Sequence, residues 1–161
     1  MQISLEEMTE QEYAAFYRTS FEHQTEELMR EEELTREEAE SETQKELDEM
    51  LPNGQVTPDN YLFSIKKQRE TAGYLWFMTE MNEDVKQAFL CDILVYEQYR
   101  RNGCGEAALA EMERLAKGMD CRKCVMFVDG NNHAAKSLYE KCGYEALREH
   151  SYGYFMKKTI M

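Results

Sequence analysis

A glycine-containing loop between an apolar strand and an amphipathic helix constrains the fold of this chain most. The segment 88–95 is apolar apart from Asp92. The loop that follows it reads Tyr99-Arg100-Arg101-Asn102-Gly103-Cys104-Gly105. Beyond the loop, residues 106–117 place apolar side chains at nearly helical spacing. The pattern therefore predicts a strand, a tight turn and the start of a helix, in that order.

The start of a helix is a favourable place for a phosphate. Several backbone N–H groups there have no partner within the helix, the helix dipole is positive at that end, and glycines let an oxygen approach the backbone closely. We therefore expect this loop to bind a pyrophosphate. A dinucleotide fingerprint would need a third glycine, and Ala108 stands at that position.

A second motif follows the strand-like segment 124–128. Residues 132–144 read Asn-His-Ala-Ala-Lys-Ser-Leu-Tyr-Glu-Lys-Cys-Gly-Tyr. Asn131 or Asn132 can cap the start of a helix here, and Gly143 can take the left-handed conformation that ends one. This segment therefore predicts a short helix with a defined start and end.

Together the two motifs resemble those of the GNAT superfamily of acyl-CoA-dependent N-acetyltransferases, in its small, single-domain, bacterial type. Arg100, Gly103 and Gly105 match the family's Arg/Gln-x-x-Gly-x-Gly/Ala loop. Residues 132–144 match its Asn-x-x-Ala-x-x-Leu-Tyr-Glu-Lys-x-Gly-Phe/Tyr helix. The resemblance covers residues 60–158, and it implies an acetyltransferase enzyme.

The resemblance implies an α+β fold, the GNAT fold, with a mixed, mostly antiparallel central sheet flanked by helices. Its element order is β-α-α-β-β-β-α-β-α-β-β. The residue pattern agrees at the start, because Thr9 with Glu12 and Thr35 with Glu38 form two capping boxes. We expect one domain over residues 1–161. Within it, residues 1–60 are an acidic helical region on the acceptor side, and residues 61–161 hold the sheet and the acetyl-CoA-binding core.

Acetyl-CoA is the co-substrate that the resemblance implies. Backbone amides of the loop would hold its pyrophosphate, Arg100 and Arg101 would supply positive charge, and the strand end 94–96 would pair with the pantetheine arm and polarise the thioester carbonyl. The predicted cofactor-binding residues are Leu94, Val95, Tyr96, Arg100, Arg101, Asn102, Gly103, Cys104, Gly105, Glu106, Asn132, Ala135 and Tyr139. We predict no metal site.

Two residues are predicted to be catalytic in a direct attack of an amine on the thioester. Tyr139 matches the family tyrosine that acts as general acid toward the departing CoA thiolate; the alternative is an aromatic side chain packed on the sheet. Asp92 is the first candidate for the base, because a carboxylate in an apolar strand must be paired, solvated or functional. Ion pairing or an exposed strand face is the alternative for Asp92, and Glu80 is a weaker candidate.

The acidic charge is concentrated in one part of the chain. The formal net charge is −13, and residues 1–60 carry 18 Asp and Glu against 4 Lys and Arg. This balance disfavours nucleic-acid binding, which needs a basic surface. An acidic region would attract a cationic acceptor, either a small molecule or the lysine or N-terminal amine of a peptide. A solvated helical face that keeps the protein soluble is the alternative.

The remaining features concern location and partners. The five cysteines are odd in number and predict reduced thiols rather than a disulfide framework. We expect a cytoplasmic protein without a signal peptide or membrane span. A non-catalytic acyl-CoA-binding regulatory module and an acidic helical interaction protein remain alternatives. The family context also allows a homodimer, whereas the acceptor, the acyl-chain preference and the oligomeric state are left open by the sequence.

Overall fold

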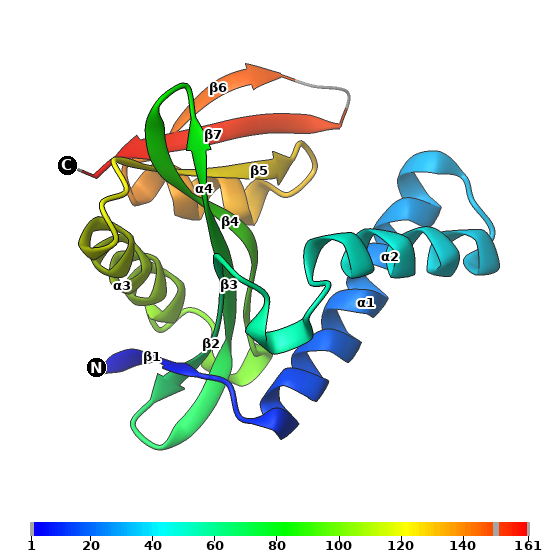
Figure 1. Cartoon of the computed structure of the whole chain (residues 1–161), viewed down its shortest axis with the longest axis horizontal. Helices are drawn as coiled ribbons and strands as arrows, with labels where there is room; N and C mark the ends of the chain where they lie inside the picture. The colour runs from blue at the N-terminus through cyan, green and yellow to red at the C-terminus, as the bar shows by residue number, and fades with distance from the viewer. Residues whose placement is uncertain (1, 150–151, 161) are drawn as a thin grey trace. The chain divides into compact units, whose positions relative to one another are not determined.

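The chain forms two units. The computed structural model describes residues 2–149 and 152–160. Unit 1 comprises Met1–Glu7 and Tyr61–Met161, which carry the alternating apolar segments, and unit 2 comprises Met8–Asn60, which carries the two capping boxes (Figure 1).

The strands form one mixed sheet of seven strands in the order β1-β2-β3-β4-β5-β7-β6. β4 and β5 pair in parallel, whereas β1 with β2, β3 with β4, β5 with β7, and β6 with β7 pair antiparallel. The strands are β1 (Ile3–Glu7), β2 (Asn60–Lys67), β3 (Glu70–Asn82), β4 (Val85–Val95), β5 (Lys123–Asp129), β6 (Glu145–Glu149) and β7 (Gly153–Thr159). A short 3₁₀ turn, η2 (Glu97–Tyr99), follows β4.

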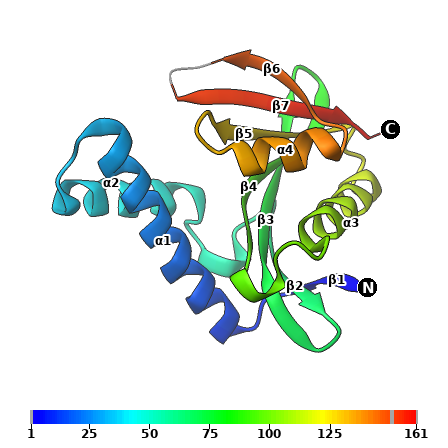
Figure 2. The same cartoon turned by 180° about the vertical axis from the view of Figure 1, so that it is seen from behind.

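Helices α3 (Cys104–Gly118) and α4 (His133–Lys141) contribute to the core of unit 1. Leu109 and Met112 of α3 and Tyr139 of α4 belong to the same buried cluster as Leu75 and Phe77 of β3. Figure 2 shows α4 lying over β5. The strand residues that alternate with this cluster therefore point to the other face of the sheet.

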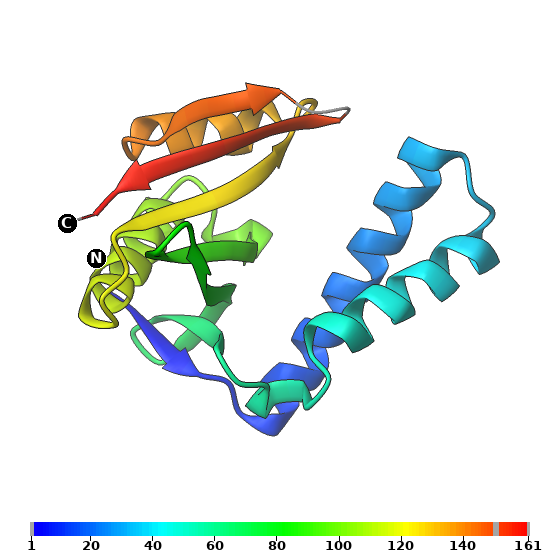
Figure 3. The same cartoon turned by 45° about the horizontal axis from the view of Figure 1, so that its top comes forward.

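Unit 2 is a helical hairpin of α1 (Glu10–Glu32) and α2 (Arg36–Met50), followed by a 3₁₀ turn, η1 (Gly54–Val56) (Figure 3). Both predicted capping boxes are present, at Thr9 and Thr35. Contacts between the helices include a hydrogen bond between the buried hydroxyls of Thr25 and Thr43, 3.2 Å apart. The exposed Arg36 of α2 pairs with Glu22 of α1 at 3.0 Å.

A bulge and an early end of pairing open the sheet at one place. Trp76 pairs with Asp92 and Phe77 pairs with Leu90, so Cys91 is an extra residue in β4. The parallel pairing of β4 with β5 ends at Leu90 opposite Met126, although both strands continue beyond these residues. β4 and β5 therefore diverge after the bulge.

The predicted α+β fold and its element order are confirmed by the seven-stranded mixed sheet and its helices. One detail differs, because the 3₁₀ turns η1 and η2 were not predicted. Within the described residues, no helix is long and apolar enough to cross a membrane.

Gly73 is a position where the sheet has no room for a side chain. A Cβ at Gly73 would lie 1.9 Å from the carbonyl oxygen of Leu94. We expect Gly73→Ala to lower the free energy of unfolding by about 3 kcal/mol, the upper range for overpacking, measured by urea denaturation. Gly118→Ala is the control, because a Cβ there meets nothing within 4 Å. An equal loss in both variants would show that the close approach to Leu94 is not the cause.

Candidate functional site

A cavity of about 530 Å³ lies where β4 and β5 diverge. The end of β4, the glycine loop, the start of α3 and one side of α4 form its walls. Its lining residues are Ile93, Leu94, Val95, Tyr99, Arg100, Arg101, Gly103, Cys104, Gly105, Glu106, Asn132, Ala134, Ala135, Leu138, Tyr139 and Lys141. The two sequence motifs therefore meet at one site, although about thirty residues separate them in the chain.

The loop presents the start of α3 to this cavity. Gly103 precedes the helix with φ 78°, a left-handed conformation that favours glycine. No side chain caps this helix start, whereas side-chain oxygens cap α1, α2 and α4. The Ala107 N–H donates to the Gly103 carbonyl at 3.0 Å and begins the helical bonding. The first turn of α3 therefore offers backbone donors to an anion.

The charged side chains around the cavity favour an anion as well. Arg100, Arg101 and Lys141 line it together with one carboxylate, that of Glu106. Lys141 pairs with Glu106 at 2.5 Å, and both side chains are exposed, so solvent screens the pair. The Arg100 Nε donates to the carbonyl of Val95 at 2.8 Å, which ties the loop to the end of β4.

Tyr139 of α4 lines the cavity and is buried there. The side chain of Asn132 accepts from the Ala135 N–H at 3.0 Å and fixes the start of α4, about two helical turns before Tyr139. Tyr139 is 7% exposed. Burial raises the pKa of its hydroxyl to about 12, and the charge of Asp92 adds to the rise, followed by that of Cys142. The hydroxyl is therefore protonated at neutral pH.

Asp92 lies beside the bulge on β4 and does not line the cavity. The hydroxyl of Tyr74 donates to its Oδ2 at 3.0 Å. Tyr74 is 1% exposed, and burial, followed by the charge of Asp92, raises the pKa of the Tyr74 hydroxyl. Asp92 stands two residues after Leu90, on the part of β4 that is no longer paired with β5.

Most of the predicted cofactor-binding residues line the cavity, and two do not. Tyr96 is outside it, and its N–H donates to the carbonyl of Ala72 at 2.8 Å. Asn102 is exposed in the loop and is also outside it. The prediction that these two residues contact the ligand is therefore not supported by the cavity.

Five lining residues were not predicted: Ile93, Tyr99, Ala134, Leu138 and Lys141. Ala134, Leu138 and Lys141 stand at helical spacing within the second motif, so the periodicity of α4 could have identified them. Tyr99 is held by a hydrogen bond from its hydroxyl to Glu70. That contact joins distant parts of the chain and has no local sequence signal.

The other residues considered in the sequence lie away from the cavity or inside the core. Glu80 accepts from the Nε2 of Gln87 at 2.6 Å, on the hairpin of β3 and β4. Cys104 is 2% exposed, so its thiol is packed while its backbone belongs to the helix start. Cys121 and Cys124 are buried free thiols, as expected for structural cysteines.

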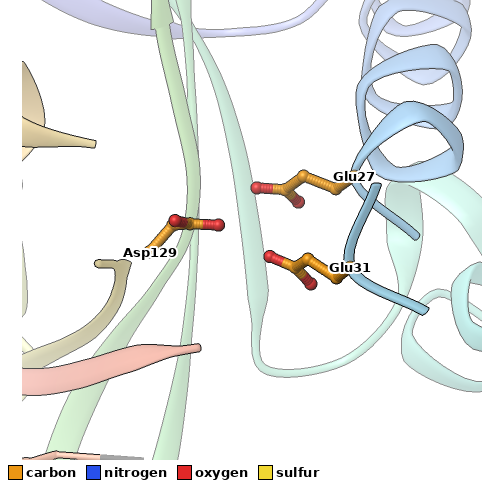
Figure 4. Close-up of side chains that lie close together, drawn as sticks. All are labelled: Glu27, Glu31 and Asp129. Atoms are coloured by element: carbon orange, nitrogen blue, oxygen red, sulfur yellow. The ribbon is translucent and has the colours of Figure 1, made fainter. Parts of the chain in front are cut away.

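Figure 4 labels three further carboxylates. Glu27 and Glu31 belong to unit 2, and Asp129 belongs to unit 1. Glu27 and Glu31 stand one helical turn apart on α1 of unit 2, a spacing at which like charges repel. Asp129 ends β5 of unit 1, where its Oδ1 accepts from the Asn131 N–H at 2.8 Å. That bond shapes the turn that leads into α4.

Comparison with known proteins places this geometry among relatives. The model of the Acetyltransferase (GNAT) family matches residues 9–144. The uncharacterized N-acetyltransferase YycN of Bacillus subtilis (strain 168) is 30% identical over 146 residues, which are 90% of this chain and 94% of that protein. The uncharacterized N-acetyltransferase YdgE of the same organism is 29% identical over 145 residues, 89% of this chain and 92% of that protein.

Two solved structures are similar as well. The crystal structure of Bacillus subtilis YycN has a TM-score of 0.86 and 28% identity, and the match covers 93% of this chain and 96% of that chain. The PaiA N-acetyltransferase from Thermoplasma acidophilum, solved in complex with coenzyme A, has a TM-score of 0.72. It is 16% identical over 99% of each chain and shows the fold alone.

The cap of α4 supports the placement of Tyr139, and its removal is measurable. We expect Asn132→Ala to lower the free energy of unfolding by about 1 kcal/mol, the usual value of an N-cap, because the Ala135 N–H loses its acceptor. Urea denaturation followed by circular dichroism measures the loss. Asn131→Ala is the matched control, because Asn131 is the adjacent residue, has the same side chain and is exposed. A similar loss in both variants would contradict the cap.

Proposed function

The chain belongs to the acetyltransferase (GNAT) family, and on this premise we propose that it transfers the acetyl group of acetyl-CoA to a primary amine by direct attack. The family, the fold and the enzyme class agree with the sequence-based predictions. They favour an enzyme over a non-catalytic module or a helical interaction protein. One observation carries the proposed reaction: the uncapped start of α3 and the Tyr139 hydroxyl line the same cavity.

The donor fits the cavity by its chemistry. The pyrophosphate of acetyl-CoA binds at the first turn of α3, where Arg100, Arg101 and Lys141 add positive charge. The backbone of β4 beyond Leu90 is no longer paired with β5. An extended pantetheine arm can take the place of the missing strand, because its amides match the donors and acceptors of a strand edge.

The reaction needs one proton acceptor and one proton donor. A cationic amine first releases one proton to solvent, because only the neutral amine can attack the thioester. As the nitrogen then bonds to the thioester carbon, a second proton passes from it to Asp92, and backbone N–H groups of β4 stabilise the developing oxyanion. The carbon–sulfur bond then breaks, and the CoA thiolate takes the proton of the Tyr139 hydroxyl. The proton held by Asp92 finally restores that hydroxyl, so the products are an amide and the CoA thiol.

Asp92 and Tyr139 are coupled in this scheme. The negative charge of Asp92 is one cause of the raised pKa of Tyr139. When Asp92 takes the proton of the amine, that charge is neutralised and the Tyr139 hydroxyl becomes a stronger acid. The proton donor is therefore activated at the step in which the thiolate departs.

The acceptor is proposed to be a cationic amine. Residues 1–60 carry 18 acidic against 4 basic side chains. A field of this sign raises the local concentration of cations and speeds their encounter with the protein. The Asp92 carboxylate then supplies a negative group at the opening between β4 and β5 for the ammonium.

Replacing the proposed acid tests the mechanism. We expect Tyr139→Phe to lower kcat by about 100-fold, the smaller end of general acid catalysis, while the affinity for acetyl-CoA stays the same. Thiol release and a thermal shift with acetyl-CoA measure the two quantities separately. Tyr144→Phe is the matched control: it also removes a buried hydroxyl, which donates to Glu113 at 2.9 Å. An unchanged kcat in Tyr139→Phe would return this residue to a packing role.

Salt dependence tests the attraction of cations. We expect kcat/KM for a cationic amine to fall steadily between about 0.01 and 0.5 M salt, because screening shortens the reach of the field. An arylamine that is uncharged at neutral pH should show no such trend. Replacing the exposed Glu37 and Glu42 by glutamine should lower kcat/KM for the cation alone. Equal salt curves for both amines would remove the basis for electrostatic attraction.

A further inference from the structure

An apolar patch lies on the face of the sheet opposite the core. On β5 and β7, Cys124, Met126 and Met156 belong to the core cluster, so the alternating residues Phe127 and Phe155 point to the other face. Phe127 is 40% exposed. Phe155 is half-buried beside it. Tyr139 of α4 belongs to the core cluster, so α4 covers the core side of the sheet. An exposed aromatic side chain on a sheet face can form part of a binding surface.

The patch begins at the opening between β4 and β5. Phe127 is the first residue of β5 beyond the last parallel pair, Leu90 with Met126. The bulged residue Cys91 follows Leu90 on the opposite strand. Phe127 therefore stands at the edge of the same opening that gives rise to the cavity, but on the other side of the sheet.

Asp92 shares this face of the sheet with Phe127. Its strand partner is Trp76, and its hydrogen-bond donor is Tyr74. Both alternate along β3 with Leu75 and Phe77, which belong to the core cluster. Asp92 on β4 and Phe127 on β5 therefore lie across the opening from each other. Both are on the face of the sheet away from the donor cavity.

The two phenylalanines form one aromatic platform. The rings of Phe127 and Phe155 lie 5.1 Å apart at an interplanar angle of 72°, an edge-to-face arrangement. β5 and β7 pair with each other from Lys123 opposite Thr159 to Asp129 opposite Gly153, so both rings are carried by a rigid ladder. Such a platform can receive a flat apolar group with little loss of its own freedom.

We propose that the acceptor is an amine carried by a flat apolar group, and that the ammonium lies at Asp92 while the apolar group packs on Phe127 and Phe155. The inference rests on the proposed acetyl transfer and names its substrate class. The positive ammonium complements the negative carboxylate of Asp92. The platform begins at the opening between β4 and β5, because Phe127 is the first residue of β5 beyond the last pair. β4 and β5 are no longer paired where Asp92 and Phe127 lie, so the amine and the ring must be joined by a linker, and 2-phenylethylamine is the probe.

Matched amines test this inference. Thiol release with 2-phenylethylamine and with ethylamine gives the ratio of their KM values in the full-length enzyme. We expect the wild type to have a KM at least about tenfold lower for 2-phenylethylamine, because burial of a ring is worth that factor or more. Phe127→Ala should reduce this preference to about twofold or less, and Phe127→Tyr should restore it.

Two further variants keep the test decisive. Phe127→Thr suits a strand and removes the ring, so it replaces Phe127→Ala if that variant does not fold. Met81→Ala is the matched control, because Met81 is 66% exposed and lies at the far end of β3, beside the hairpin turn. The control should keep the wild-type ratio of KM values.

The outcomes separate this inference from the function on which it rests. If the wild type releases thiol with both amines at the same KM, or if Phe127→Ala keeps the preference, the platform is overturned while the transferase stands. If no amine supports thiol release, the proposed function fails and the substrate class fails with it. If Phe127→Ala changes the oligomeric state in size-exclusion chromatography and leaves the KM ratio unchanged, the face binds a second copy and the inference is overturned.

Discussion

The early end of pairing between β4 and β5 is the constraint on which the rest of the site depends. Backbone groups of a strand inside a sheet are normally consumed by the neighbouring strand. Here the ladder stops at Leu90 and Met126, and the extra residue Cys91 bends β4 away from its partner. The sheet thus gains an internal edge, with the donor cavity on one side and an apolar face on the other.

The proposed acid, Tyr139, and the proposed base, Asp92, lie on opposite faces of the sheet. Tyr139 is buried on the core side, which favours its neutral form, whereas Asp92 lies on the opposite face, where Tyr74 supports its carboxylate. If the two groups shared one closed pocket, they would titrate as a strongly coupled pair. Separated by the opening, they still interact, and a substrate that bridges it can change the charge of one and so the acidity of the other.

The sequence predicted local geometry well and long-range register poorly. The turn at Gly103, the cap at Asn132 and the position of Tyr139 follow from neighbouring residues, and the structure has all three. The bulge at Cys91 depends on how two strands align, and the contact of Tyr99 with Glu70 joins distant segments. Neither leaves a pattern in a short window of sequence.

The same distinction separates the donor from the acceptor. A nucleotide-bearing donor is held largely by backbone N–H groups of one loop and one helix start. A few consecutive residues of the sequence are therefore enough to predict such a site. The proposed acceptor surface consists of side chains from β3, β4, β5 and β7, which only the finished sheet brings together. Substitutions at Phe127 or Phe155 leave the donor loop untouched. A family built on this sheet can therefore change its acceptor by altering exposed side chains on one face, while the donor site and the proton relay stay in place.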